Sequence, residues 1–368
     1  MEYTATVGGL ADFLNDWAPV GLAESYDNVG LLVGRREWHV ERVLVALDIT
    51  EAIVEEAVQR GAQAIVAHHP VVFQGLKKLV GQSDAVRAVE CAIQSRIALL
   101  AAHTNLDAVA DGVSVHLAQK LGLESVRILE PRAQQLLNLT VFVPTESVSA
   151  VREAVLAAGA GKVGNYDRCG FSTPGVGTFR PLERANPAVG SVGKEEEVNE
   201  VRLEFLVPKT RRLAVEKALF EAHPYEVVAH FWHEHQGLWE DVGFGAVGNW
   251  SEGKTWKEAV QTVKSSLGLS SMRHSSPPKG LITCVAVCGG SGSDLLEQAQ
   301  RSGAQLFITS DVKYHRYFDA DSRCALVDIG HAESEQHTVE LMIARISEKF
   351  RNFAVLGAET RTNPVTTS

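Results

Sequence analysis

The sequence predicts an α/β protein in which both ends of the chain form one duplicated domain, with a smaller α+β domain inserted between them. Two nested internal repeats and the apolar character of the expected strands support this fold class. The chain has 368 residues, a length that suits two domains. Its composition, 45% hydrophobic and 22% charged, is that of an ordinary globular protein.

The outer repeat pairs segment 42–73 with segment 283–315. Each segment contains an apolar strand, a polar or glycine-rich turn, an amphipathic helix and a second apolar strand. A further apolar strand follows in each half, in "RIALLAAHTNLD" at 96–107 and "RCALVDIGHAESE" at 323–335. Near-continuous apolar strands are typical of parallel sheets that are covered on both faces. We therefore predict βαβ units in one domain made of residues 1–130 and 236–368.

The inner repeat pairs segment 137–171 with segment 201–232. Each copy contains a strand, a Val-Pro pair, an amphipathic helix, a turn and a second strand. Two such units in tandem predict a ferredoxin-like α+β domain over residues 131–235. Segment 172–200 is rich in glycine and proline, so we expect a long loop or an extended hairpin there.

Polar side chains follow the expected strands in both halves of the outer domain. In open α/β sheets, ligands bind beyond the carboxyl ends of the strands, and packing the halves side by side would bring these groups together. The first half supplies His68, His69, His103, Thr104, Asn105 and Asp107, and the second supplies Asp311, Lys313, His315, Asp328, His331, Glu333 and Glu335.

Imidazoles and carboxylates without thiolates suit Zn, Mn, Fe or Co, and this set alone does not choose among the four metals. Because neighbouring side chains in a strand point apart, His68 and His69 would bind one ion each in a two-metal site. The alternative is that the pair is structural.

Charge and cysteine content exclude several classes of protein. The net charge of −10 argues against broad nucleic-acid binding, which needs a basic surface. Five cysteines without a C-x-x-C pair predict neither a disulfide framework nor a thiolate zinc site. The N-terminus lacks a basic signal region, and no apolar run approaches the roughly 20 residues of a membrane span. We expect a soluble, cytoplasmic protein with no membrane partner.

Five segments of the chain resemble the signature segments of a known family, and they occur in the family's order. They are "SYDNVGLLVG" (25–34), "AHHPVVFQGLKKL" (67–79), "AHTNLDAVADGV" (102–113), "GGSG" (289–292) and "GHAESE" (330–335). The family is the NGG-interacting-factor-like family, whose bacterial members are often named GTP cyclohydrolase type 2 homologues. Through "GKVGNYDRCGFSTPGVGTFRP" and "AHPYE", the inner domain resembles the PII-like or CutA-like insertion of the longer members. The chain departs at Ser310, where the family pattern has glycine.

The resemblance implies a dinuclear metal centre and an assembly. Its ligands would be His68, His69, Asp107, His331 and Glu335, which match the family motifs without substitution. Two divalent ions per chain are expected, with zinc first and Mn, Fe or Co as alternatives. The resemblance also implies a ring-shaped homohexamer whose metal sites face an internal cavity.

The function we expect from these features is that of a metal-dependent hydrolase. A water held between two divalent ions would be the nucleophile, and the family name suggests GTP or a related nucleotide as substrate. His103 or His315 would act as general acid or base, or would instead orient a metal ligand. Lys77 would bind a phosphate of the substrate, unless it is only a solvated surface lysine. The alternative function is a non-catalytic metal-binding scaffold in which 172–200 is a ligand-responsive loop.

Overall fold

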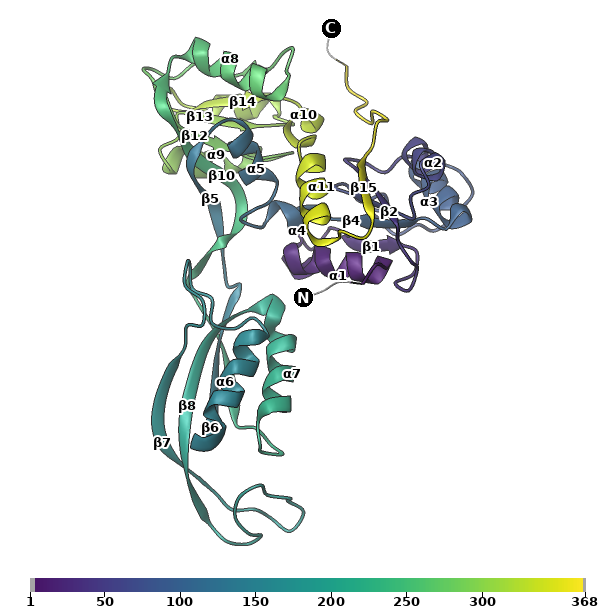
Figure 1. Ribbon diagram of the computed structural model, residues 1–368. Helices are drawn as coiled ribbons and strands as arrows, with labels where there is room; N and C mark the ends of the chain where they lie inside the picture. Colours follow the sequence, from purple (N-terminus) through teal and green to yellow (C-terminus); the bar gives the residue numbers. More distant parts are fainter. Residues whose placement is uncertain (1–3, 367–368) are drawn as a thin grey trace. The chain divides into compact units, whose positions relative to one another are not determined.

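A computed structural model describes residues 4–366 of the chain (Figure 1). The contacts divide the chain into two compact units. The first unit contains the described residues up to Glu130 together with those from Val242 onward, and the second runs from Pro131 to Asp241. Two long strands, β5 (Glu124–Ala133) and β10 (Leu238–Lys254), run across the two boundaries.

A five-stranded sheet in the first unit has the strand order β1-β4-β3-β2-β15. Strands β2, β3, β4 and β15 are parallel, whereas β1 is antiparallel to β4 at the edge. Every residue of β3 and β4 is buried, which explains their unbroken apolar sequences. The strands are β1 (Gly30–Val33), β2 (Arg42–Ala46), β3 (Ala64–Ala67), β4 (Ala98–Ala101) and β15 (Ala354–Gly357).

The helices of this half begin at side-chain caps. Thr50 accepts a hydrogen bond from the amide of Ile53 at the start of α2 (Glu51–Gln59), and Ser83 does the same for Val86 in α3 (Asp84–Ser95). Helix α1 (Val7–Trp17) is capped by Thr6. The apolar faces of α2 and α3 pack with β2, β3 and β4 in one core.

A six-stranded sheet in the same unit has the order β11-β14-β13-β12-β10-β5. Strands β12, β13 and β14 are parallel, and β10 and β11 are antiparallel to their neighbours β12 and β14. The additional strands are β11 (Arg273–His274), β12 (Ile282–Val287), β13 (Leu306–Thr309) and β14 (Ala325–Asp328). Both sheets of the first unit thus contain three adjacent parallel strands in the same spatial order, β4-β3-β2 and β14-β13-β12.

Helix α8 (Trp256–Leu267) of the first unit begins at a capping box formed by Thr255 and Glu258. The remaining helices of this unit are α4 (Thr104–Asp107), α5 (Val113–Lys120), α9 (Leu296–Arg301), α10 (His331–Glu335) and α11 (Thr338–Lys349). Short 3₁₀ helices occur at η1 (Val20–Leu22), η4 (Ser293–Leu295) and η5 (Tyr314–Phe318) in this unit, and at η2 (Thr145–Ser147) and η3 (Lys209–Arg211) in the second.

The second unit is a four-stranded antiparallel sheet with the order β7-β8-β6-β9. Its strands are β6 (Leu136–Pro144), β7 (Phe171–Phe179), β8 (Glu196–Pro208) and β9 (His230–Glu234). Figure 1 shows α6 (Val148–Ala157) and α7 (Arg212–Ala222) beside this sheet, and their apolar residues share one core with β6 and β8. Strands β7 and β8 form an extended hairpin, so the glycine-rich segment at 172–200 consists of most of β7, the start of β8 and the long loop that joins them.

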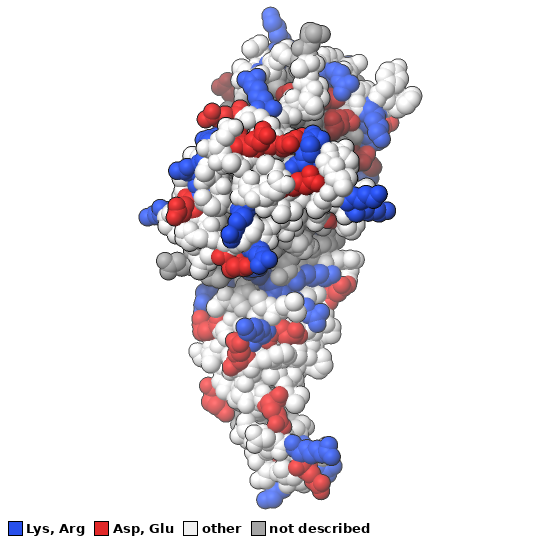
Figure 2. Space-filling model, turned by 90° about the vertical axis from the view of Figure 1, so that its right-hand side faces the viewer, with Lys and Arg blue, Asp and Glu red and all other residues white. Residues whose placement is uncertain are grey.

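Three general properties of the described chain are relevant to its function. All five cysteines are free. Within residues 4–366, no helix is long and apolar enough to cross a membrane. On the described part of the face in Figure 2, Lys and Arg side chains are interspersed with Asp and Glu side chains.

Candidate metal centre

The carboxyl end of β3 presents the two adjacent histidines. The amide of His68 donates to the carbonyl of Ala46 at 3.3 Å, and the amide of His69 donates to that of Leu47 at 2.9 Å. The β2–β3 ladder therefore extends through both histidines and fixes their backbone. The ring of His68 is fully buried, and its centroid lies 5.0 Å from that of His69.

The carboxyl end of β4 brings His103 and Asp107 to the same place. The backbone amide of His103 donates to Oδ1 of Asn105 at 2.9 Å, and α4 then carries the chain to Asp107. Oδ1 of Asp107 lies 3.7 Å from Nε2 of His68. The ring of His103 lies edge-on to the rings of His68 and His69, at centroid distances of 5.2 and 5.4 Å.

Helix α10, which follows β14, supplies His331 and Glu335 from the other half of the unit. The two residues are one helical turn apart, and Nε2 of His331 lies 3.0 Å from Oε2 of Glu335. The same carboxylate oxygen lies 3.0 Å from Nε2 of His69, while Oε1 lies 3.6 Å from Nε2 of His68. Glu335 therefore directs one oxygen toward each of the two adjacent histidines.

The four histidines share one hydrogen-bonding pattern, in which Nδ1 faces an oxygen acceptor and Nε2 faces the cluster. An acceptor at Nδ1 fixes the tautomer and leaves the Nε2 lone pair free for a metal ion. The acceptors are the Ala102 carbonyl for His68 (2.8 Å), Asp48 for His69 (2.7 Å), Asp27 for His103 (2.9 Å) and Asp311 for His331 (2.6 Å).

Two buried atoms in the cluster support a fit to metal ions. Nε2 of His68 and Oδ1 of Asp107 are buried and have no hydrogen-bond partner among the described residues. Such atoms are rare because an unpaired buried polar group is costly, and an ion between them would satisfy both. Two groups have ligand atoms within 4.8 Å of one another, namely His68, His69 and His103, and His69, His331 and Glu335. The residues therefore fit bound metal.

The histidines and carboxylates of the cluster shift one another's pKa values. Burial disfavours the charged form of His69, but hydrogen bonds to Asp48 and Glu335 outweigh it and raise the pKa of His69 to about 10. The Glu335 carboxylate similarly raises the pKa of His331 to about 9. Burial raises the pKa of Asp107 to about 7, whereas the surrounding imidazoles hold the pKa of Glu335 well below its usual range against the effect of burial. A divalent ion would replace the imidazole protons, so its binding releases protons.

Gly290 makes room for the Glu335 carboxylate. It has a positive φ of +64°, and a Cβ at this position would lie 2.3 Å from Oε1 of Glu335. Its amide donates to Oγ of Ser334 at 2.9 Å, which ties the turn after β12 to helix α10. The "GGSG" segment thus forms a turn that packs closely against helix α10.

The segment after β15 contacts Asp48, the residue that accepts the hydrogen bond from His69. Oγ1 of Thr362 donates to Oδ2 of Asp48 at 2.5 Å, while Oδ1 of the same carboxylate accepts from His69. Nδ2 of Asn363 donates to Glu333 of α10 at 3.0 Å. This C-terminal segment therefore links the anchor of His69 to the helix that carries His331.

An exposed aromatic side chain, Phe73, lies next to His103, and a second, Tyr26, lies next to Phe73. The ring centroid of Phe73 lies 6.3 Å from that of His103 and 6.1 Å from that of Tyr26. Tyr26 is 62% exposed and Phe73 is 45% exposed, so both offer ring surface to a ligand.

Within residues 4–366, the structure brings together six of the eight site residues predicted from sequence, and these six do not include His315 or Lys77. The ring of His315 contacts Tyr314 and Phe318 within η5, at 5.2 and 6.3 Å. Lys77 lies exposed in the segment between β3 and α3. The remaining six, which come together, are His68, His69, His103, Asp107, His331 and Glu335.

Sequence reasoning missed the residues that position these ligands. Asp48 follows β2 and was a detectable signal, because a third parallel strand ends there. Asp27 lies within the "SYDNVG" segment and Gly290 within "GGSG", although neither was expected to position a candidate metal ligand. For Thr362 the sequence contains no signal, since its contact depends on where the C-terminal segment folds back.

The fold and the site define a mixed α/β protein that carries a histidine–carboxylate cluster able to hold metal. The chain belongs to the Duf34/NIF3 (NGG1p interacting factor 3) family, whose profile matches residues 5–364. Relatives named "GTP cyclohydrolase 1 type 2 homolog" include one from Halalkalibacterium halodurans, 36% identical with 95% of each chain covered, and one from Bacillus subtilis, 35% identical with 97% of each covered. The crystal structure of a Bacillus cereus protein related to NIF3 matches 99% of both chains at 34% identity, with a TM-score of 0.86. The family resemblance drawn from the sequence is confirmed.

Proposed function

We propose that the protein is a hydrolase that depends on two divalent metal ions and acts on GTP or a related nucleotide. The observation that supports it most is the position of Glu335, whose two oxygens lie 3.6 Å from Nε2 of His68 and 3.0 Å from Nε2 of His69. A carboxylate that lies between two adjacent imidazoles could supply one oxygen to each of two ions.

The ligands would divide into two sets around Glu335. His68 and Asp107 would hold one ion, because their free buried atoms face each other. His69 and His331 would hold the other, because their Nε2 atoms lie 3.4 Å apart and both lie 3.0 Å from Oε2 of Glu335. Zinc is the first candidate, with Mn, Fe and Co as alternatives. When bound, such ions supply Lewis acidity and activate water as a nucleophile.

His103 is the group best placed to hold or move a proton. Oδ1 of Asp27 accepts the hydrogen bond from its Nδ1, and the amide and hydroxyl of Thr104 hold the other carboxylate oxygen at 3.0 and 2.5 Å. This network orients the His103 ring and leaves Nε2 as the atom that exchanges a proton with substrate. We prefer His103 to His315 because the ring contacts of His315 are with Tyr314 and Phe318.

Two features support a nucleotide as the substrate. Phe73 beside His103, and Tyr26 beside Phe73, present exposed ring surfaces on which a planar base could stack. Lys77, exposed in the segment that leaves the histidine pair, would bind a phosphate as a point charge. The names of the relatives point to the same class of substrate.

We also propose the organisation that the family resemblance implies. The first unit would be a duplicated metal-binding domain, because its two sheets share three parallel strands in the same order. The second would be an inserted PII-like domain, supported by its antiparallel sheet and two helices. The chain would be cytoplasmic and would form a ring-shaped homohexamer. Sedimentation analysis of the purified protein would test the number of chains in the assembly.

Turnover across a nucleotide panel tests the proposed activity. Protein stripped with a chelator is reloaded separately with Zn, Mn, Fe or Co, and loading is measured before each assay. GTP, GDP, guanosine and ATP are then incubated with each form, and products are identified by mass spectrometry. We expect turnover of a guanine nucleotide with at least one metal and none with the stripped protein. Fully loaded protein that leaves every nucleotide intact would contradict the proposal.

A second function is favoured by one observation in the second unit. That unit contains a pocket of about 290 Å³, lined by its own β7, β8 and the segment before β9. The chain would then be a metal-binding regulatory scaffold that senses a small molecule through this unit. Metal-dependent turnover separates the two functions, because only the first requires it.

A further inference from the structure

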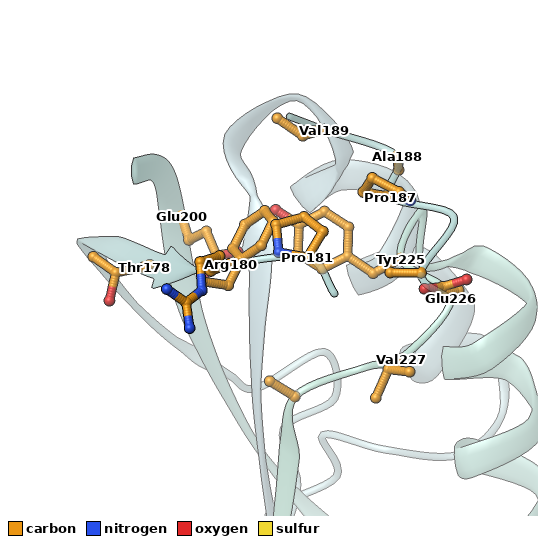
Figure 3. A pocket seen from close by; sticks show the side chains of 14 residues that line it. Thr178, Arg180, Pro181, Pro187, Ala188, Val189, Glu200, Tyr225, Glu226 and Val227 are labelled. Carbon is orange, nitrogen blue, oxygen red and sulfur yellow. The ribbon is translucent and has the colours of Figure 1, made fainter. Parts of the chain in front are cut away.

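The pocket in the second unit lies between the β7–β8 hairpin and the segment that joins α7 to β9. Its volume of about 290 Å³ lies at the lower end of the range for small-molecule sites. Apolar side chains form most of its wall, among them Phe179, Pro187 and Val227. Polar groups are few, and Figure 3 shows three of them, Arg180, Glu200 and Tyr225, around the same space.

Glu200 places a carboxylate in this apolar setting. It lies in the central strand β8 and is only 9% exposed. A Cβ at Gly177 would lie 2.3 Å from Oε2 of Glu200, so the glycine leaves the room that this side chain occupies. Among the described residues the carboxylate forms no ion pair with any Lys, Arg or His. Because a buried unpaired charge is costly, a cation from outside would be strongly favoured here.

Tyr225 places a buried hydroxyl group beside the carboxylate. Its hydroxyl oxygen is buried and has no hydrogen-bond partner of normal geometry within residues 4–366. Figure 3 shows its ring extending across the pocket toward the side on which Glu200 lies. Burial, a side-chain interaction of the hydroxyl with Glu200 and the charge of that carboxylate raise the pKa of Tyr225, so the phenol keeps its proton.

The other charged residues of the lining differ in their availability. The carboxylate of Glu226 already accepts the backbone amide of Asn186 at 3.0 and 3.2 Å and so holds the loop between β7 and β8. Arg180 is exposed and lines the pocket, and its guanidinium forms no ion pair with a described residue. The pocket thus offers one buried anionic site and one accessible cationic site.

We propose that this pocket binds a small zwitterionic amino compound of the free amino-acid class. The ligand's ammonium group would pair with Glu200, its carboxylate would pair with Arg180, and its apolar side chain would contact Pro187 and Val227. The Tyr225 hydroxyl would lie beside the Glu200 carboxylate that pairs with the ammonium group. This site is independent of the metal centre and of the proposed hydrolase activity.

Calorimetric titration of the full-length protein tests the proposal. Each common L-amino acid is titrated in turn, and the tightest binder is compared with its decarboxylated amine and its deaminated acid. We expect the amine to bind more weakly than the amino acid, because it lacks the contact with Arg180. We expect the deaminated acid not to bind, because nothing then offsets the charge of Glu200.

Variants assign the binding to the pocket. Glu200→Gln removes the charge with little change of shape and should weaken binding at least about tenfold, since a hydrogen bond to a charged group is lost. Glu197→Gln makes the same change at an exposed position of the same strand and should leave the affinity unchanged. Arg180→Ala should weaken binding of the amino acid but not that of the amine.

Three results would overturn the proposal. One is that no amino acid and no amine binds to the wild-type protein. The second is equal binding by Glu200→Gln and wild type. The third is tighter binding by the deaminated acid than by the amine. Circular dichroism of Glu200→Gln checks its fold, and if the variant is unfolded, the comparison of the three ligands on wild type still decides the outcome.

Discussion

Oε2 of Glu335 lies 3.0 Å from Nε2 of His69, although the two residues lie 266 positions apart in the chain. Strand β3, which precedes His69, belongs to the five-stranded sheet, whereas the helix that contains Glu335 follows β14 of the six-stranded sheet. The cluster therefore forms only when the two halves of this unit pack together.

Asp48→Asn should weaken metal binding without unfolding the protein. The carboxylate of Asp48 accepts the hydrogen bond from Nδ1 of His69 and so holds Nε2 toward the cluster. Loss of such a partner typically lowers metal affinity by about 10- to 100-fold. Competition with a chromophoric chelator measures the affinity, and circular dichroism checks the fold. Thr362→Val removes only the group that supports Asp48 and should have a smaller effect. Unchanged affinity in Asp48→Asn would show that His69 does not need this anchor.

Gly290→Ala should damage the site through a steric clash. The new Cβ would lie 2.3 Å from Oε1 of Glu335, and the residue would keep a strained positive φ of +64°. We expect a loss of stability of about 1–3 kcal/mol together with reduced metal content. Gly303→Ala is the matched control, because Gly303 has a φ of +83° but no atom within 4 Å of a Cβ. Thermal unfolding and metal analysis of both variants separate backbone strain from the clash; equal metal content in the two would refute the clash.

Glu56 should make the stability of the first unit depend on pH in the acid range. Its carboxylate accepts the amides of Glu359 and Thr360 at 2.9 Å, which holds the C-terminal segment on helix α2. Although burial opposes ionisation, these hydrogen bonds lower the pKa of Glu56 to about 2 from an ordinary value of 4.5. Because the folded pKa is the lower one, the stabilisation is complete above pH 4.5 and is lost as the pH falls toward 2.

The variant Glu56→Gln isolates this contribution. At pH 7 the wild type should exceed it in free energy of unfolding by about 1–3 kcal/mol, the usual loss for hydrogen bonds to a charged group. Denaturant unfolding at several pH values measures the difference, which should shrink steadily below pH 4.5. A difference that stays constant down to the acid limit would mean that the charge of Glu56 is not responsible.

Lys77→Ala should raise the KM for a phosphorylated substrate and leave metal content unchanged. The lysine lies outside the cluster, so its loss would remove substrate binding and not coordination. Added salt should mimic the effect in wild type, because an exposed ionic contact is screened. Lys78→Ala, the neighbouring change, should have less effect. Equal KM values for Lys77→Ala and wild type would show that Lys77 is only a solvated surface lysine.

Much of the fold could be predicted because its strands are encoded locally. The apolar runs that became β3 and β4 are buried on both sides, and the turns and helices between them have recognisable patterns. His68 and His331 were found because polar groups directly follow such runs. Their role as metal ligands stays a prediction, although the structure brings them together.

The features that escaped prediction depend on contacts between distant segments. Gly290 matters only because helix α10 packs against its turn, and Asp48 matters only because His69 turns toward it. The pocket around Glu200 and Tyr225 could not be foreseen, since it forms where the β7–β8 hairpin meets the segment after α7. Alternation along a strand does not reveal which acidic residue will lack a partner.

Metal stoichiometry tests the central claim most directly. Purified wild-type protein and Glu335→Gln are each saturated with zinc, freed of excess ion and analysed by mass spectrometry for metal per chain. Glu333→Gln serves as the control, because Glu333 lies in the same helix but contacts Asn363. We expect two ions per chain in wild type and in the control, and fewer than one in Glu335→Gln, since both ions would lose a shared ligand. Two ions per chain in Glu335→Gln, or none in wild type, would contradict this claim.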